Sequence, residues 1–278
     1  MGNLIWLASY PKSGNTWLRA FLHNLLRNPE APFDINKLGA FCLGESMAHW
    51  YKEFDPRPAS QFSLGDVAKM RPKVHRAMTR SSPDNVFVKT HNALVADFGV
   101  PLVTPEVTAG MICIVRNPLD IAVSYSHHMG TSLDNTITWM ATPGARTLNS
   151  DEWVTERMGS WSEHVASWTT RPLPALHVVR YEDMQIEPFE TFAGVARFLG
   201  LDPPRERLER AVEMSSFKVL QEQERRHGFR EKSAVAERFF RAGAMGQWKA
   251  ALTQDQVARM VATHRAQMAR FGYVPDAF

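Results

Sequence analysis

The residues with the clearest capacity for chemistry stand near the start of the chain, in the string YPKSGNTW at positions 10–17. Lys12 brings an ammonium group, Ser13 and Thr16 bring hydroxyls, and the glycine between them lets the backbone approach a ligand closely. Such groups, together with the free N–H groups of a helix start, can converge on one phosphate. The string therefore predicts a phosphate-binding turn and a nucleotide ligand. The four residues KSGN alone would suit an ordinary helix cap equally well.

The order of the residues separates this turn from the loop of ATPases and GTPases. That loop reads GxxxxGK[ST], with the lysine directly after the second glycine. In this chain Lys12 precedes Gly14 by two residues, and no glycine stands at the required distance before Tyr10. The spacing argues against an ATPase or a GTPase.

A second polar pair ends the string VFVKTH at positions 86–91. Residues two apart in a strand project to the same side, so Lys89 and His91 would present a cation and a titratable base together. A histidine taken alone is more often structural than catalytic, and the chain contains 10 of them. The neighbouring lysine favours a functional role for His91.

Two further strings carry polar groups at the ends of apolar runs. In MICIVRNPLDIAVSYSHH, positions 111–128, Arg116 and Ser124 could hold a second phosphate. The alternative is that Arg116 only pairs with Asp120 at a helix start. In RYEDM, positions 180–184, Tyr181 offers an aromatic ring with a polar tip.

Apolar runs and helical spacing define the elements that must position these groups. We expect strands over residues 4–9, 86–90, 111–115 and 176–180, helices over residues 15–27, 118–128 and 160–170, and several further helices toward the C-terminus. Alternating strands and helices form a parallel sheet flanked by helices, and ligands bind beyond the carboxyl ends of its strands. No linker divides the chain, so we expect one α/β domain over residues 1–278.

The composition indicates which class of ligand the protein binds and where in the cell we expect it. The net charge of +3 and the pI near 8.9 suit an anionic small molecule without requiring nucleic acid. Cys42 and Cys113 lack the spacing of a metal site, and a disulfide between them is not expected. The sequence shows no secretion signal and no apolar run of about 20 residues. We expect a cytoplasmic protein that binds neither nucleic acid nor a membrane.

Taken together, these strings resemble motifs of the cytosolic sulfotransferases, the soluble enzymes that use 3′-phosphoadenosine 5′-phosphosulfate (PAPS). YPKSGNTW is similar to the family's 5′-phosphosulfate loop, KTH to its catalytic strand, RNPLDIAVSYSH to its 3′-phosphate motif and RYEDM to its adenine-contacting turn. GSWSEHVASW, SSFKVL and FFRAGAMGQWK also resemble family segments. The resemblance covers residues 4–249 in order and implies a P-loop nucleotide-binding sulfotransferase fold.

The resemblance also implies which residues bind the nucleotide. They are Lys12, Ser13, Gly14, Asn15 and Thr16 on the 5′ side, Arg116, Ser124, Arg241 and Gly243 at the 3′-phosphate, Trp17, Tyr181 and Phe217 at the adenine, and Ser215 and Phe240 as further contacts. Arginine suits the phosphate positions because its planar fork gives parallel charge-assisted bonds. For the aromatic residues, packing in the core is the alternative interpretation.

The implied reaction is in-line transfer of a sulfuryl group to the hydroxyl of a small-molecule acceptor, an alcohol or a phenol. The product nucleotide is 3′-phosphoadenosine 5′-phosphate (PAP), and no metal is implied. His91 would take the acceptor proton, while Lys12 and Lys89 would neutralise developing charge. A P-loop kinase using ATP and magnesium is an alternative, but it should show GxxxxGK. A non-catalytic nucleotide-binding module is another, but it would not keep these three side chains.

The chain departs from the family pattern at several positions. Asn15 stands where vertebrate members usually have threonine, and Ala242 where the family commonly has a lysine near the 3′-phosphate. The family's dimerisation motif KxxxTVxxxE is half present, since Lys249 and Thr253 fit while the valine and glutamate are absent. A homodimer formed by that route is therefore in doubt.

The acceptor pocket has no motif of its own in this sequence. Aromatic residues in residues 28–84 would either line an apolar acceptor cleft or pack the core, and the sequence favours neither. They are Phe33, Phe41, Trp50, Tyr51, Phe54 and Phe62. Residues 130–158 and 221–240 lack clear motifs, and we expect them to act as mobile lids.

Overall fold

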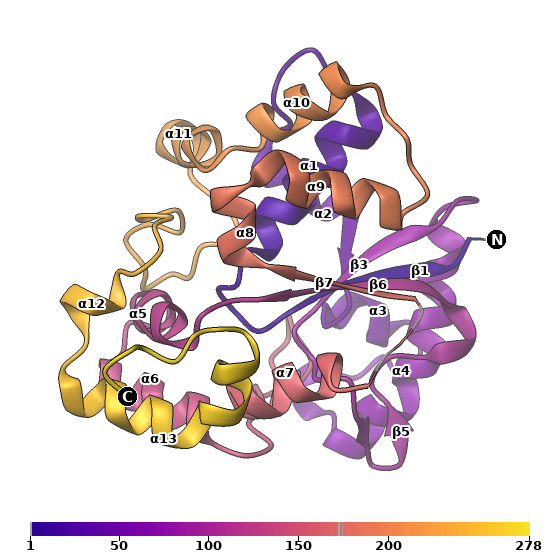
Figure 1. The fold of residues 1–278 in the computed structure, drawn as a ribbon. Helices are drawn as coiled ribbons and strands as arrows, with labels where there is room; N and C mark the ends of the chain where they lie inside the picture. The colour runs from indigo at the N-terminus through magenta and orange to yellow at the C-terminus, as the bar shows by residue number, and fades with distance from the viewer. Residues whose placement is uncertain (1, 172, 174) are drawn as a thin grey trace. The chain divides into compact units, whose positions relative to one another are not determined.

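A five-stranded sheet with the strand order β2-β3-β1-β6-β7 organises the fold (Figure 1). Its strands are β1 (Leu4–Ser9), β2 (Cys42–Gly44), β3 (Val86–Thr90), β6 (Thr108–Val115) and β7 (Leu176–Arg180). The computed structural model describes residues 2–171, 173 and 175–278. A separate antiparallel pair joins β4 (Ala96–Asp97) to β5 (Val100–Pro101).

The register of the central strands aligns their polar ends. β1 and β3 are parallel, with Leu7 opposite Lys89 and Ala8 opposite Thr90, and β2 is parallel to β3, with Gly44 opposite Lys89. All six residues of β1 are buried, as an apolar run with covered faces requires. The register brings the end of β1 beside His91, one residue beyond β3.

Helices make up most of the rest of the chain (Figure 1). They are α1 (Asn15–Arg27), α2 (Leu38–Phe41), α3 (Ala48–Lys52), α4 (Leu64–Met78), α5 (Pro118–Met129), α6 (Leu133–Ala141), α7 (Trp161–Thr169), α8 (Tyr181–Ile186), α9 (Pro188–Phe198), α10 (Arg205–Met214), α11 (Phe217–His227), α12 (Trp248–Ala251) and α13 (Gln254–Arg270). None of the helices within the described residues is long and apolar enough to cross a membrane.

The α/β class and the elements predicted from the sequence are confirmed, with small shifts at their ends. β6 begins three residues earlier than expected, and α5 ends one residue later. The sequence analysis missed β2, which is only three residues long, and α4, which contains Pro72. A proline inside a helical pattern usually marks its end. Here a capping box between Ser63 and Asp66 starts the helix and identifies it.

The described chain divides into two compact units whose stretches alternate along the sequence. Unit 1 comprises Met1–Tyr10, Cys42–Cys113 and Met140–Val178, and unit 2 comprises Pro11–Phe41, Ile114–Trp139 and Val179–Phe278. Unit 1 therefore holds β1, β2 and β3. The prediction of one domain over residues 1–278 stays a prediction.

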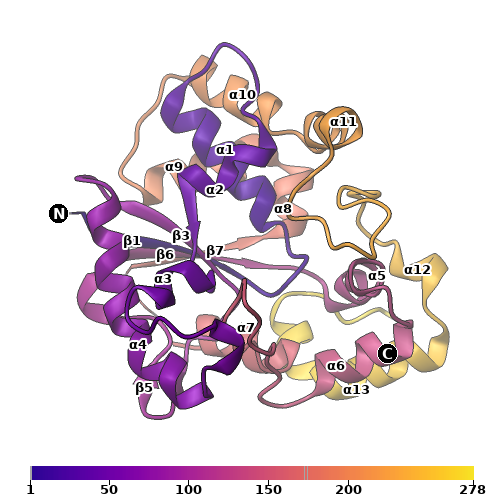
Figure 2. The ribbon, with the colours of Figure 1, turned by 180° about the vertical axis from the view of Figure 1, so that it is seen from behind.

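Within unit 2, α1 packs against α10, and α9 packs against α10 and α8 (Figure 2). Every residue of α1 from Asn15 to Leu25 is buried. The rings of Phe21 on α1 and Phe192 on α9 stack with centroids 4.1 Å apart. This packing holds α1 in place, and the predicted phosphate turn leads directly into the N-terminal end of this helix.

Candidate nucleotide-binding and catalytic residues

The predicted phosphate turn has the backbone shape that binds anions. Lys12 and Gly14 both adopt positive φ, 66° and 103°. Backbone that enters the left-handed region turns successive N–H groups toward one side, where an anion can bind. A Cβ at position 14 would lie 2.7 Å from a ring carbon of Tyr181, so only glycine fits there.

Several polar atoms around this turn are buried without a hydrogen-bond partner among the described residues. They are Ser13 Oγ, Trp17 Nε1 and Arg116 Nε. A buried polar group that lacks a partner costs free energy, on the order of 1–3 kcal/mol. A bound phosphate would satisfy the serine and arginine donors. The residues present therefore fit a nucleotide that carries phosphate groups.

Arg116 is held in place by two contacts within unit 2. Its Nη1 donates to the carbonyl oxygen of Lys12 at 2.8 Å, and its guanidinium carbon lies 4.0 Å from the ring centroid of Tyr181. Only 5 % of Arg116 is exposed. The arginine is thus fixed against the phosphate turn, with donors left for a ligand.

The alternative in which Arg116 serves Asp120 is not supported, because Arg116 contacts Lys12 and Tyr181 whereas Asp120 has other partners. Its carboxylate accepts hydrogen bonds from the backbone N–H groups of Gly246 (2.7 Å) and Trp248 (3.1 Å). Asp120 therefore anchors the C-terminal loop that contains Arg241 and Gly243. The sequence analysis missed this role.

Buried carboxylates hold two more segments of unit 2. Glu224 accepts from the N–H groups of Phe239 (2.7 Å) and Phe240 (2.8 Å). Glu182 accepts from the N–H of Asn117 (3.0 Å), directly after Arg116, and from the hydroxyl of Tyr273 (2.6 Å). The expectation that residues 221–240 form a mobile lid is not supported by these anchors.

The C-terminal loop approaches α11 at Gly243. This residue has a φ of 59°, and a Cβ there would lie 2.4 Å from ring carbons of Phe217. The hydroxyl of Tyr181 donates to the carbonyl oxygen of Gly243 at 3.4 Å. The structure thus brings together three predicted nucleotide-binding residues: Tyr181, Phe217 and Gly243.

Other predicted nucleotide-binding residues are largely occupied by protein contacts. Trp17 is 8 % exposed and lies 5.9 Å from the ring centroids of both Tyr181 and Phe192, which favours its packing role. Ser215 is fully buried, and its hydroxyl donates to the carbonyl of Ala211 at 2.8 Å. This bond argues against Ser215 as a nucleotide contact.

The remaining predicted nucleotide-binding residues also lie in unit 2, and their side chains differ in how far they are exposed to solvent. Asn15 and Thr16 are buried in the first turn of α1, and Ser124 is half-buried on α5. Arg241 is exposed and hydrogen-bonds Gln247, while Phe240 is buried. All predicted nucleotide-binding residues therefore belong to unit 2.

Lys12 is the predicted catalytic residue of unit 2. Its ammonium nitrogen lies 3.6 Å from the ring centroid of Phe239. A cation above an aromatic face is stabilised by the ring's negative electrostatic potential. The loop that Glu224 anchors thus also positions the Lys12 ammonium.

Lys89 and His91 belong to unit 1 and are both half-buried. His91 Nδ1 lies 2.7 Å from the carbonyl oxygen of Ser9, which can only accept a hydrogen bond. Nδ1 therefore carries the proton in the neutral ring, and Nε2 carries the lone pair. This is the tautomer in which Nε2 can act as a base.

The backbone of His91 is held as well. Its N–H donates to Glu156 Oε1 at 3.2 Å. The ring of His164 hydrogen-bonds the His91 backbone, and burial lowers the pKa of His164 to about 3, so that His164 is neutral at physiological pH. The sequence analysis missed both partners because neither lies in a motif with an evident chemical role.

The aromatic residues proposed for an acceptor cleft take several different positions. Tyr51 is fully buried and Phe62 is 4 % exposed, so these two pack the core. Phe33 stacks on His23 with centroids 3.4 Å apart, and Phe41 lies edge-on to the same ring. Phe54 is exposed. Core packing is thus the better interpretation for Tyr51 and Phe62.

The segments around residues 144–158 are fastened to the rest of unit 1. Val154 donates its N–H to the carbonyl of Ser46 at 2.8 Å, and Ala48 donates to Glu152 at 2.9 Å. These bonds argue against a mobile lid here. Thr253, half of the possible dimerisation motif, caps α13 through a capping box with Gln256, which accounts for it without a partner chain.

Metal-binding clusters of three or more histidine, cysteine or carboxylate side chains are absent from the described part of the chain. Cys42 and Cys113 are both buried, and neither forms a disulfide within the described residues. The expectation of metal-free chemistry remains a prediction.

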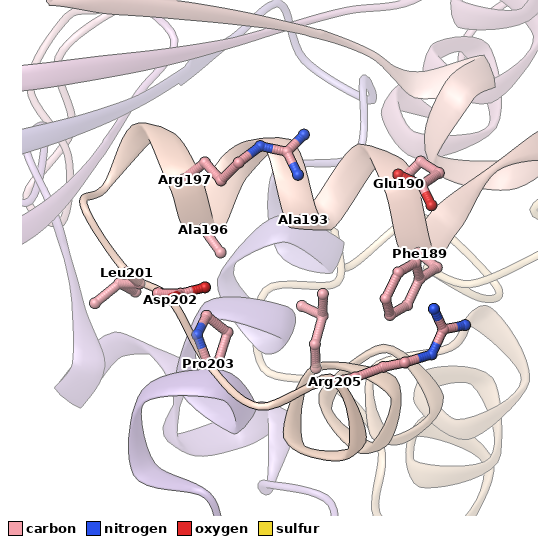
Figure 3. Close-up of a pocket in the computed structure, with 10 residues that line it drawn as sticks. Phe189, Glu190, Ala193, Ala196, Arg197, Leu201, Asp202, Pro203 and Arg205 are labelled. Atoms are coloured by element: carbon pink, nitrogen blue, oxygen red, sulfur yellow. The ribbon is translucent and has the colours of Figure 1, made fainter.

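A pocket of about 240 Å³ opens between α9 and α10 in unit 2 (Figure 3). Phe189 and Arg205 face each other at one end, with the guanidinium carbon 4.5 Å from the ring centroid. The predicted nucleotide-binding residues, all of which the structure describes, do not line this pocket. It is separate from the candidate site.

Comparisons with known proteins place the chain in a family. The sulfotransferase domain matches residues 3–272. Sulfotransferase 2A6 of Rattus norvegicus is 26% identical over 279 residues, which cover 98% of this chain and 86% of that protein.

Solved structures agree with this match at the level of the fold. Retinol dehydratase in complex with androsterone and the inactive cofactor PAP superposes with a TM-score of 0.65 at 18% identity, over 95% of this chain and 80% of that one. Mouse sulfotransferase SULT7A1 complexed with PAP gives a TM-score of 0.61 at 19% identity, over 96% and 84% of the two chains. The chain belongs to the sulfotransferase family and has its fold.

Proposed function

We propose that this sulfotransferase transfers a sulfuryl group from PAPS to the hydroxyl of a small-molecule acceptor. The observation that carries the proposal is the buried, unsatisfied pair of donors Ser13 Oγ and Arg116 Nε beside the phosphate turn. Both donors suit phosphate oxygens, and the related structures contain PAP, which has a phosphate at each end of its ribose.

In this proposal unit 2 holds the nucleotide. The turn from Lys12 to Thr16 binds the 5′ side through backbone N–H groups and hydroxyls, at the positive end of α1. Arg116 binds the 3′-phosphate, assisted by Arg241 and Ser124. Arginine binds phosphate bidentately, so the fixed Arg116 contributes most of the discrimination in favour of a 3′-phosphate.

The chemical step needs a base and positive charge at the bridging oxygen. His91 Nε2 takes the proton of the acceptor hydroxyl as the acceptor oxygen forms a bond to sulfur. The bond from sulfur to the 5′-phosphate oxygen breaks, and PAP leaves with that electron pair. Lys12 and Lys89 stabilise the charge on the leaving oxygen and the sulfuryl oxygens. The tautomer fixed by Ser9 supports the base role of His91.

The acceptor is an alcohol or a phenol of small size. Androsterone, the hydroxysteroid named in the related retinol dehydratase structure, is one compound of this class. The proposal covers both phenols and aliphatic alcohols.

The experiment is incubation of the purified chain with PAPS, EDTA and a panel that contains 2-naphthol, androsterone and a simple alcohol. Mass spectrometry follows PAP and the sulfated acceptor. We expect PAP to form in equal amount with a sulfated product for at least one hydroxyl compound. Magnesium-dependent conversion of ATP to ADP in a parallel reaction, without any sulfated product from PAPS, would overturn the proposal in favour of a kinase.

A further inference from the structure

We propose that Glu45 is a positioning residue that fixes the end of β3, and with it Lys89 and His91, for the transfer reaction. The inference rests on the catalytic roles proposed above for these two side chains. Glu45 directly follows β2, lies in unit 1 and is completely buried. Buried carboxylates are rare unless they are paired, so its position calls for an explanation.

Glu45 binds the chain on both sides of His91. Its backbone N–H donates to the carbonyl oxygen of Lys89 at 3.2 Å, which continues the pairing of β2 with β3 by one residue. Its Oε2 accepts from the side-chain amide of Asn92 at 2.8 Å. Glu45 thus binds both Lys89 and Asn92, which flank the proposed base His91.

Asn92, the side chain that Glu45 binds, is also held by hydrogen bonds to other residues. Asn92 is completely buried, its Oδ1 accepts from the N–H of Arg157 at 2.7 Å, and its carbonyl accepts from Trp168 Nε1 at 3.1 Å. The acceptor and donor ends of the amide therefore have separate partners, which fixes its orientation. A displacement of the Glu45 carboxylate would be transmitted to Asn92 and to its neighbour His91.

The negative charge of Glu45 is balanced by Arg71. The two side chains form an ion pair, Arg71 is 2 % exposed, and its Nη2 also donates to the carbonyl of Thr155 at 3.1 Å. Burial lowers the pKa of Arg71 to about 10, so the guanidinium stays protonated at neutral pH. The hydroxyl of Tyr51 donates to Glu45 Oε1 at 2.9 Å.

His75 approaches the same carboxylate without changing its charge balance. Its Nε2 lies 3.6 Å from Glu45 Oε1, and its Nδ1 lies 2.7 Å from Thr104 Oγ1. Burial, followed by the charge of Arg71, lowers the pKa of His75 well below its ordinary value, so the ring is neutral. Glu45 and Arg71 are therefore a one-to-one buried pair, and such pairs act through geometry more than through net stability.

The expected effect on catalysis follows from the precision that the reaction needs. A misplacement of a reacting group by about 1 Å can reduce a rate about 100-fold. The nucleotide-binding residues lie in unit 2, and none of the contacts of Glu45 described above involves them. Loss of the Glu45 link should thus reduce turnover while leaving nucleotide affinity unchanged.

The test uses the full chain with Glu45→Gln, and Asp97→Asn as the matched control. Asp97 is also a buried carboxylate of unit 1 paired with arginines, Arg146 and Arg157. It contacts none of residues 89–92 in the contacts described, and it binds only the side chain of Arg157, whose backbone N–H holds Asn92. Three quantities are measured: the affinity for PAP by calorimetry, turnover of PAPS with the acceptor found above, and the ¹⁵N resonances of the His91 ring. The His91 signals are assigned by their loss in His91→Gln.

We expect PAP affinity to be unchanged in Glu45→Gln, turnover to fall about 100-fold and the His91 ring to exchange between tautomers in place of one fixed Nδ1–H form. Asp97→Asn should keep the wild-type His91 signals and turnover. Where Glu45→Gln does not fold, Asn92→Ala removes the same link and leaves the Glu45–Arg71 pair intact.

Wild-type His91 resonances and turnover in a folded Glu45→Gln or Asn92→Ala chain would overturn the inference. The resonance measurement requires no acceptor and no PAPS. A chain that never forms PAP but shows the predicted change in His91 would therefore contradict the proposed function without contradicting the positioning role.

Discussion

The phosphate turn in unit 2 and the surroundings of His91 in unit 1 treat their polar groups in opposite ways. In unit 2, the phosphate turn leaves Ser13 Oγ and Arg116 Nε buried and unsatisfied among the described residues. In unit 1, the groups around His91 have partners: Ser9, Glu156 and the Glu45 link. Unsatisfied donors await a ligand, whereas satisfied networks hold a geometry. The comparison indicates that the proposed nucleotide binding and the proposed chemical step depend on differently prepared polar groups.

The largest expected effect is a loss of turnover, without a loss of PAP affinity, when the proposed base in unit 1 is removed. His91→Ala removes the proposed base and should lower turnover by about 10²- to 10⁴-fold, because a general base contributes that much. The affinity for PAP should remain that of the wild type. Turnover is measured as PAP formation from PAPS, and affinity by calorimetry.

His49→Ala is the matched control, since His49 is an exposed histidine on α3 of the same unit. It should behave as the wild type in both measurements. Full turnover in His91→Ala would show that the base lies elsewhere, and a large loss of PAP affinity would contradict the division between the units.

The second-largest expected effect is a loss of affinity for PAP. Arg116→Ala removes charge-assisted bonds to phosphate and should weaken PAP binding about 10- to 100-fold. Arg241→Ala should cost less, because Arg241 is exposed and its charge is screened by water. Calorimetric titration of both variants with PAP shows which of the two loses more affinity.

Arg180→Ala provides the control for the loss of an arginine beside a tyrosine. Its guanidinium carbon lies 5.3 Å from the ring centroid of Tyr273, in an arrangement similar to that of Arg116 and Tyr181. PAP affinity should be unchanged in this variant. An equal loss in Arg180→Ala and Arg116→Ala would mean that the effect is structural and not a lost phosphate contact.

Buried histidines in both units link stability to pH, and His264 and His164 are one example from each. Burial lowers the pKa of His264 to about 4 and that of His164 to about 3, from an ordinary value of 6.5. Below pH 6.5 the unfolded chain binds protons that the folded chain does not, so stability falls as the pH falls toward 4. Each histidine contributes a slope of about 1.4 kcal/mol per pH unit in this window.

Urea unfolding between pH 7 and pH 4 measures this slope. His164→Gln and His264→Gln should each make it shallower, since each removes one such group. Only His164→Gln should also lower turnover, because its ring hydrogen-bonds the backbone of His91. Slopes identical to the wild type would show that these rings do not resist protonation in the folded chain.

The smallest effect tests the departure from the family at Ala242. Because Ala242 is exposed in the C-terminal loop, Ala242→Lys adds a cation without a steric conflict. PAP affinity should rise about 2- to 5-fold at low salt and the gain should vanish at high salt, since exposed charge pairs are weak and screened. Ala262→Lys, at an exposed position of α13, should give no gain. A gain that persists at high salt would indicate a change other than charge.

The phosphate turn could be predicted from the sequence because its signal is local. The strand, the turn residues and the helix lie within 24 consecutive positions, Leu4–Arg27, and each shows in its own pattern. Gly14 and Gly243 also belong to recognisable strings, and both occupy positions where a side chain would collide.

The network around Glu45 could not be predicted in the same way. Glu45 and Arg71 are 26 positions apart, and charged residues are ordinarily exposed. Their burial depends on β2, a strand of three residues, and on α4, which contains Pro72. The partners of Asp120 are likewise backbone N–H groups, 126 and 128 residues away, that no side-chain pattern reveals.

The most direct test of the account is calorimetric titration of the chain with PAP and with ADP, which lacks the 3′-phosphate, in the presence of EDTA. We predict that PAP binds at least about 10-fold more tightly than ADP, because the donors around Arg116 would otherwise stay unsatisfied. Equal affinity for the two nucleotides, or binding of ATP that requires magnesium, would contradict the assignment of unit 2 as the site of PAPS.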